Sequence, residues 1–263
     1  MDGTAKILKF ELHDVLRSKW MIMYSLFFLL LTEGLFRFGG TQAKVILSLM
    51  NIVLIIIPLV SIVFGTMYVY HSREFIELLL SQPIQRHKIF WGVYSGLAIP
   101  LSAGFVIGVG IPSLIYGIHT SQDAATMLVL IGAGVFLTFI FVALSFSVSI
   151  RYEDRLKGLG LSILVWFFFA IMYDGMVLLL IFTFGDYPLE KAIIGINLLN
   201  PIDTARTLLL LQFDISALMG YTGAVFHKFF AGWQGILISV VSLSLWIALP
   251  LFTGLRTFNK KDF

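Results

Sequence analysis

Two carboxylates lie inside long apolar stretches of this sequence, where an ionisable group is costly. One of them, Asp174, sits near the middle of the apolar stretch 158–184. An acid at that depth in a membrane costs at least about 2.5–3.5 kcal/mol, so it should face protein or water. Two readings stay open: an acid that hydrogen-bonds and packs helices, or an acid that lines a transport pathway. Met172 and Met176 flank it as further pathway candidates, because thioethers suit Cu(I), although packing is the commoner role of methionine.

Glu33 is the second of these acids. It lies four residues before Arg37, and this spacing favours an ion pair on one face of a helix. Asp174 has no such partner on its own segment, where the only basic residue is Lys157 at the start. Its counter-charge must therefore come from another span, from a second copy of the chain or from a transported cargo.

The sequence contains none of the motifs that would indicate enzymatic chemistry. It has no G-x-x-x-x-G-K-[ST] phosphate loop, no H-E-x-x-H and no G-x-S-x-G. Cysteine is absent, which excludes disulfides, thiolate metal sites and a cysteine nucleophile. The five histidines fall near the ends of apolar stretches or in loops, on both sides. We expect no catalytic residue, no metal site and no cofactor bound by this chain.

Composition indicates an integral membrane protein. Of 263 residues, 59% are hydrophobic and only 13% are charged, whereas a soluble domain is nearer half apolar and a quarter charged. Six apolar segments approach or exceed the roughly 20 residues needed to cross a bilayer core. They are expected at about 20–36, 45–70, 91–117, 125–149, 158–184 and 233–255. The fold class is therefore all-α, with residues 1–263 forming a single transmembrane domain.

Basic residues predict the orientation of the six spans. Of the 18 Lys and Arg, 13 fall within 1–19, 71–90, 150–157 and 256–263. By the positive-inside rule, both termini and the 71–90 loop lie in the cytoplasm. The net charge of +3 reflects these loops, so no nucleic-acid partner is expected. Residues 4–18 form a basic amphipathic pattern that is typical of a helix lying among lipid headgroups.

Two shorter elements are expected outside the spans. At about 72–82, Ser72 is a good N-cap for a helix whose apolar residues form a ridge beside charged ones. The ridge is Phe75, Ile76, Leu79 and Leu80, and the charged residues are Arg73, Glu74 and Glu77. Such a ridge needs a cover, either the membrane surface or a cytoplasmic partner. On the other side, within 185–231, Asn200-Pro201 starts a short interfacial or re-entrant helix, and Asp203 suits its dipole.

The 71–90 loop resembles the loop after the second span in ABC type-2 permeases. The match rests on Arg73-Glu74, Glu77-Leu78-Leu79-Leu80-Ser81-Gln82-Pro83, Arg86, Lys88-Ile89 and Gly92. The resemblance implies that 72–82 is the coupling helix, which inserts into a groove on an ATPase subunit, and that 4–18 is the elbow helix. It also implies a homodimer in the inner membrane of a bacterium or archaeon, with two copies of a separate ATPase that binds ATP and Mg.

A narrower resemblance concerns the fifth span and the outer segment. Trp166 to Asp174 and Leu198-Leu199-Asn200-Pro201-x-Asp203-x-x-Arg206 resemble the permeases that serve maturation of nitrous-oxide reductase, a copper enzyme. The resemblance implies a sulfur or copper-related cargo. It also implies a periplasmic solenoid partner, with Asn200, Pro201, Asp203 and Arg206 as candidate contacts. Two other functions stay open: an ABC exporter of a lipid, drug or peptide, and a non-ABC channel or membrane scaffold.

Overall fold

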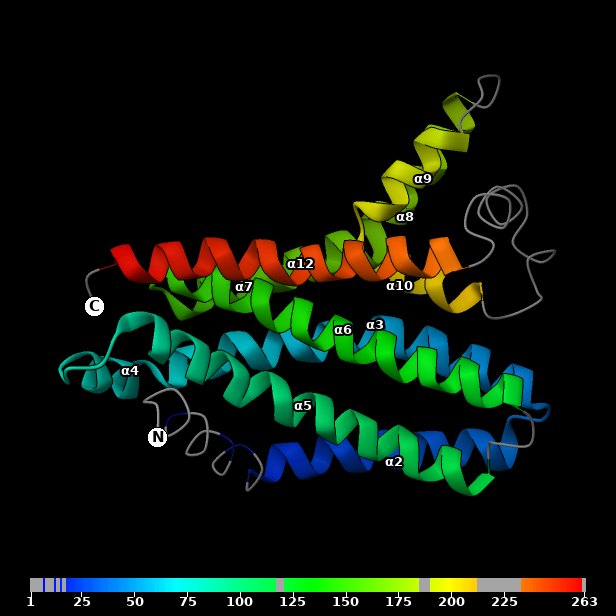
Figure 1. Ribbon diagram of the computed structural model, residues 1–263, viewed down its shortest axis with the longest axis horizontal. Helices are drawn as coiled ribbons and strands as arrows, with labels where there is room; N and C mark the ends of the chain where they lie inside the picture. Colours follow the sequence, from blue (N-terminus) through cyan, green and yellow to red (C-terminus); the bar gives the residue numbers. More distant parts are fainter. Residues whose placement is uncertain are drawn as a thin grey trace.

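The computed structural model describes Ile7, Leu12 and Val15 together with residues 18–116, 121–184, 190–211 and 233–261. The regular structure within these residues is helical (Figure 1). In chain order the elements are α2 (Lys19–Phe38), α3 (Gln42–His71), α4 (Arg73–Leu80), α5 (Arg86–Tyr116), α6 (Ser121–Arg151), α7 (Arg155–Phe167), the π-helix η1 (Phe168–Met172), α8 (Tyr173–Thr183), α9 (Glu190–Leu198), α10 (Pro201–Leu210) and α12 (Trp233–Lys260).

Six of these segments are long and apolar enough to cross a membrane, which confirms the predicted all-α multi-span fold. They are α2, α3, α5, most of α6, the continuous run α7–η1–α8 and most of α12. Several helices extend a few residues beyond the predicted apolar stretches, because a helix continues into the polar region until a turn stops it. Most of the expected helix at 4–18 lies outside the described residues. Ile7, Leu12 and Val15 are helical there, and Ile7 and Val15 are buried.

The core lies between α3, α5 and α6. Just over half, 56%, of the most apolar stretch of each is buried, against 6% for the α7–η1–α8 span. On α5, Gly104 and Gly108 lie against α2, where a Cβ at Gly108 would come within 2.7 Å of Phe28 Cβ. The GxxxG pattern therefore serves close packing of two helices within the chain. The weakly covered fifth span is the one that carries Asp174.

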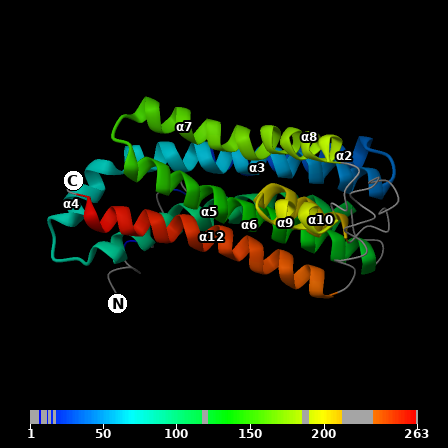
Figure 2. The same ribbon diagram turned by 90° about the horizontal axis from the view of Figure 1, so that it is seen from above.

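The spans run alongside one another in an elongated bundle, with α4 at one end (Figures 1 and 2). Near the other end, α8 and α9 turn away from the bundle axis and project from its side (Figure 1). We call these two helices, Tyr173–Thr183 and Glu190–Leu198, the α8–α9 arm. In contrast, α10 lies inside the bundle, packed against α3, α6 and α12, with most of its side chains buried.

Candidate functional site

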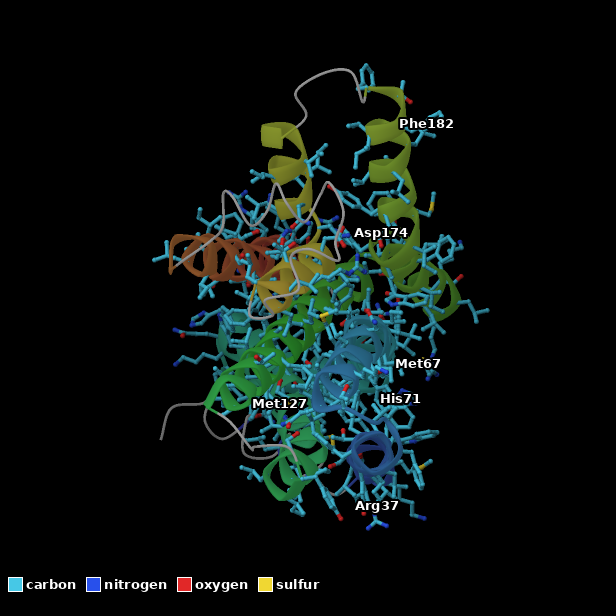
Figure 3. All side chains as sticks on the ribbon, turned by 90° about the vertical axis from the view of Figure 1, so that its right-hand side faces the viewer. Arg37, Met67, His71, Met127, Asp174 and Phe182 are labelled. Atoms are coloured by element: carbon cyan, nitrogen blue, oxygen red, sulfur yellow. The ribbon has the colours of Figure 1, made fainter. Side chains whose placement is uncertain are left out.

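Asp174 is the second residue of α8, just beyond the bend that separates the arm from the bundle. Its Oδ2 accepts a hydrogen bond of 3.1 Å from Arg206 Nη1 on α10. The counter-charge therefore comes from the same chain, from a helix outside the six spans. The two side chains remain 41% and 31% exposed, so the pair lies at the surface of this chain rather than in its core. Figure 3 shows Asp174 at the base of α8.

Arg206 also binds a second carboxylate. Its Nη1 donates to Asp203 Oδ1 at 2.8 Å, one turn earlier on α10. Asp203 is buried, and Asn200 Nδ2 donates to its other oxygen at 2.8 Å. Burial raises the pKa of Asp203, an effect that the Arg206 guanidinium opposes and the nearby Asp174 reinforces. We call Asp174, Asn200, Asp203 and Arg206 the Arg206 cluster; in its ionised form it carries one more negative than positive charge.

Asn200 connects this cluster to the bend. Its Oδ1 accepts from the backbone N–H of Ile202, which is the N-cap contact that the Asn-Pro sequence predicts. Its Nδ2 also donates to the carbonyl of Phe169 at 2.9 Å, within η1. There the backbone N–H of Tyr173 reaches back five residues to Phe168, so the helix is wider than an α-helix at this turn. Wide turns of this kind are a common cause of bends in helices.

The turn between α9 and α10 is fixed to its surroundings by further hydrogen bonds. The carbonyl of Leu198 accepts from Ser242 Oγ and from Trp246 Nε1 on α12, each at 3.1 Å. The Tyr173 hydroxyl donates to the carbonyl of Ile196 at 2.6 Å. The base of the arm is thus held by polar contacts from α10 and α12, whereas α8 itself has no buried residue.

The two methionines do not join Asp174 in one site. Met172 and Met176 are two residues before and two residues after Asp174, so at about 100° per residue each lies about 160° around the helix from it, on nearly the opposite side. Both are exposed. Within the described residues, no three His, Asp or Glu side chains come together as a metal site. A converging soft-metal site of Met172, Asp174 and Met176 is therefore not formed within one copy of the chain.

The four residues expected to meet an outside partner have a different setting. Asn200, Pro201 and Asp203 are buried within the chain, and Arg206 is held by two carboxylates. This corrects the expectation of a docking surface at these positions. The Asn-Pro pattern marks the start of a helix, and a helix start indicates nothing about exposure. The pairing of Arg206 with Asp174, 32 residues apart, had no periodic signal in the sequence.

At the other end of the molecule, α4 is the short helix expected at 72–82, but its apolar ridge faces inward. Ile76 is 5% exposed and lies beside Val69, Ile89 and Phe90 of the neighbouring spans, and Leu79 is buried as well. Phe75 and Leu80 pack partly against the same core. The expectation that this ridge is free to fill a partner's groove is therefore corrected, because the bundle already covers it. The face of α4 that remains exposed carries Glu74, Glu77 and Leu78.

Charged contacts tie α4 to two neighbouring segments. Arg73 contacts Glu77 at 3.6 Å and Glu153, in the α6–α7 connection, at 3.7 Å. Glu153 also contacts Lys261 beyond α12 at 3.4 Å. Arg86, which begins α5, donates to the carbonyl of Lys261 at 2.7 Å. The α4 end thus joins α4, the α6–α7 connection and the end of α12 into one surface. Glu33 and Arg37 form the predicted ion pair at 2.8 Å, far from this surface in sequence.

Comparison of the amino-acid sequence with known proteins identifies the family to which the chain belongs. A family profile described as "ABC-2 family transporter protein" matches residues 5–263. The "Probable ABC transporter permease protein NosY" of Pseudomonas aeruginosa is 26% identical over 93% of this chain and 91% of its own length. The protein of the same name from Stutzerimonas stutzeri is 26% identical over 81% of this chain and 83% of its own length. Because the family profile covers nearly the whole chain and the structure has six apolar spans, the chain belongs to the ABC-2 transporter family and is a multi-pass permease subunit.

Proposed function

We propose that this permease works as a homodimer with two copies of a separate ABC ATPase, which bind and hydrolyse ATP with Mg and bind the permease through α4. The observation that carries this proposal is the placement of α4. It is a separate helix between two long spans, held to the bundle by Ile76 and Leu79, with Glu74, Glu77 and Leu78 directed outward. An ATPase that grips this outer face would move α4 together with the ends of α3 and α5.

The outer face of α4 fits a protein partner. Leu78 is 57% exposed, follows Glu77 directly and lies one helical turn after Glu74, so the surface offers one apolar anchor beside two acids. A central apolar contact with a polar rim is the usual anatomy of a protein interface. Several of the candidate coupling residues already have partners within the chain: the Arg73 guanidinium contacts Glu77 and Glu153, and the apolar ridge packs against the bundle. We assign Arg73, Phe75, Ile76, Leu79 and Leu80 to holding α4, and Glu74, Glu77 and Leu78 to partner contact.

A second copy of the chain is proposed at the face formed by α7, η1 and α8. This span is the least covered of the six and carries the half-exposed Asp174–Arg206 pair. Lipid is a poor neighbour for such a pair, since charged groups in a span face protein or water. Membrane lipid suits other exposed faces, such as the Trp20 and Leu30 side of α2. A transport pathway between two copies, lined in part by Asp174, would hydrate the pair.

The cargo is proposed to be a sulfur or copper-related species for nitrous-oxide reductase maturation. The support is the likeness to two permeases named NosY, together with the residues of the fifth span and outer segment on which the resemblance rests. An exposed pair of thioethers, Met172 and Met176, is compatible with a soft cargo. A periplasmic partner, if present, would have to contact surfaces other than the buried Asn200, Pro201 and Asp203.

The ATPase partnership is tested by co-expression. The permease should copurify with an ABC ATPase encoded beside it, and reconstituted vesicles should hydrolyse ATP faster with the permease than without it. Copurification of no ATPase would contradict the proposal. For the cargo, the gene should restore nitrous-oxide reductase activity to a strain that lacks its own permease of this type. Restored export of a lipid, drug or peptide, without restored nitrous-oxide reductase activity, would instead favour the exporter function.

The proposed orientation, with both termini in the cytoplasm of an inner membrane, has its own test. Thr41, before α3, and Ser81, after α4, are exposed at opposite ends of α3. Because the chain has no cysteine, Thr41→Cys and Ser81→Cys each provide a single thiol. In intact cells an impermeant reagent should label the first position only. Labelling of Ser81→Cys alone would reverse the orientation.

A further inference from the structure

The α8–α9 arm is joined to the rest of the chain mainly at its base. No residue of α8 is buried, and Phe182 near its tip is 92% exposed. In Figure 3 α8 and α9 project side by side, with Phe182 labelled near the tip of α8, and Ile181 of α8 packs with Ile193 of α9. A pair of helices joined to the bundle at one end takes its direction from the contacts at that end.

The end of α9 is hydrogen-bonded to α10 and α12. Three other polar contacts hold η1 and the start of α8, and they act on different sides of the bend. Asn200 holds η1 through the Phe169 carbonyl, before α8 begins. Tyr173 donates to Ile196, which belongs to α9, so this contact stays within the arm. Arg206 binds Asp174, which lies beyond the bend on α8, while α10 itself remains packed among α3, α6 and α12. Among the side-chain hydrogen bonds and ion pairs described for α8, the Asp174–Arg206 pair is thus the one that joins α8 directly to the bundle, whereas α9 is held to α12 through the Leu198 carbonyl.

We propose that the Asp174–Arg206 ion pair is a latch that sets the direction in which α8 leaves the bundle, and that opening it lets α8 turn about η1 while α10 stays in place. Arg206 is thus a positioning residue, because it acts by setting the direction of α8. Its other carboxylate, Asp203, keeps the guanidinium in place when Asp174 moves away, because both bonds come from the same Nη1 atom and Asp203 is the closer partner.

The latch gives the arm a part in the proposed transport cycle, and this consequence rests on the proposed function. If two copies meet along α7 and α8, the direction of α8 determines how wide the space between them is beyond the bend. The closed latch keeps α8 near α10. The open latch releases Asp174 toward the space between the copies.

The position of the arm can be measured directly. Phe182 on α8 and Leu245 on α12 are both exposed, and spin labels on Phe182→Cys and Leu245→Cys would report the distance between arm and bundle. The labelled protein is diluted with unlabelled full-length chain in lipid nanodiscs, so that distances within one copy dominate. Asp174→Ala opens the latch and leaves Arg206 bound to Asp203. Asp203→Asn is the matched control, because it removes the other carboxylate and leaves the latch intact.

We expect Asp174→Ala to shift and broaden the distance distribution. Asp203→Asn should leave the mean distance equal to that of the spin-labelled protein without a further substitution. Asp174→Asn should give an intermediate change, since an amide can still accept from Arg206 without the charge. An unchanged distribution in Asp174→Ala, or an equal change in Asp203→Asn, would overturn the latch. The measurement needs no ATPase and no cargo, so its failure is distinguishable from failure of the proposed function, which copurification with the ATPase tests separately.

Discussion

The two ends of the molecule attach their short helices in opposite ways. At one end, α4 buries Ile76 and Leu79 against the spans and leaves its acids outside. Near the other end, α8 buries none of its residues and is held at its base by the Arg206 cluster. Apolar burial along a whole face fixes a helix firmly, whereas a polar contact at one end leaves a direction that can change. The first arrangement suits transmission of force, and the second suits a moving part.

The largest effect should come from breaking the apolar attachment of α4. Ile76→Asp places a carboxylate among apolar side chains, and even truncation of a buried isoleucine to alanine typically costs about 2–5 kcal/mol. We expect a severe loss of monodisperse protein after detergent extraction, together with a lower melting temperature. Leu78→Asp, two residues along on the exposed face, is the control and should extract normally. Equal yields from the two variants would mean that α4 is not held by its ridge.

A smaller loss is expected from removing the polar attachment at the bend. Asn200→Ala deletes the cap of α10, the contact with Phe169 and a hydrogen bond to the buried Asp203. Loss of a cap alone costs about 0.5–2 kcal/mol, so the melting temperature should fall while the protein still folds. Ser244→Ala is a suitable control, since Ser244 Oγ bonds to the carbonyl of Val240 within its own helix. An unaltered melting temperature in Asn200→Ala would remove Asn200 from the account of the bend.

The smallest effect should come from an ion pair outside both regions. Glu33 and Arg37 lie one turn apart on α2, and both are substantially exposed. Such pairs contribute about 0.2–0.5 kcal/mol, so Glu33→Gln should melt within error of the wild type and leave ATPase binding unchanged. A large loss in this variant would show that exposed ion pairs matter more in this chain than their geometry indicates. The different effects expected of Asp174→Ala and Asp203→Asn on the distance distribution would then need reinterpretation.

The sequence predicted the elements better than their surroundings. Six spans and the start of α10 follow from apolar length and from Asn200-Pro201, which are local signals. The short helix expected at 72–82 is also present, as α4, but its predicted N-cap Ser72 makes no side-chain capping hydrogen bond. The inward direction of Ile76 depends on Ile89 and Phe90 of another helix, and no local pattern distinguishes it from an outward ridge. The bend at η1 accompanies a hydrogen bond from Asn200 to the carbonyl of Phe169, 31 residues away in sequence.

The Arg206 cluster illustrates the same limit. The sequence selected Asp174 because an acid in a span is costly, and it selected Asp203 and Arg206 because of a resemblance in the outer segment. It assigned them to two separate sites, a pathway and a partner surface. The packing of α10 inside the bundle brings them together. That packing depends on contacts between distant helices, which neither hydropathy nor capping encodes.

The outer face of α4 offers the most direct test of the central claim, that this permease is driven by an ATPase bound there. Leu78→Asp should leave extraction, melting temperature and dimer formation at the wild-type level and abolish copurification of the ATPase. Leu78→Met, which keeps an apolar side chain of similar size, should retain the ATPase. Full copurification of the ATPase with a well-folded Leu78→Asp protein would contradict the claim, since the exposed apolar anchor of α4 would then have no part in binding.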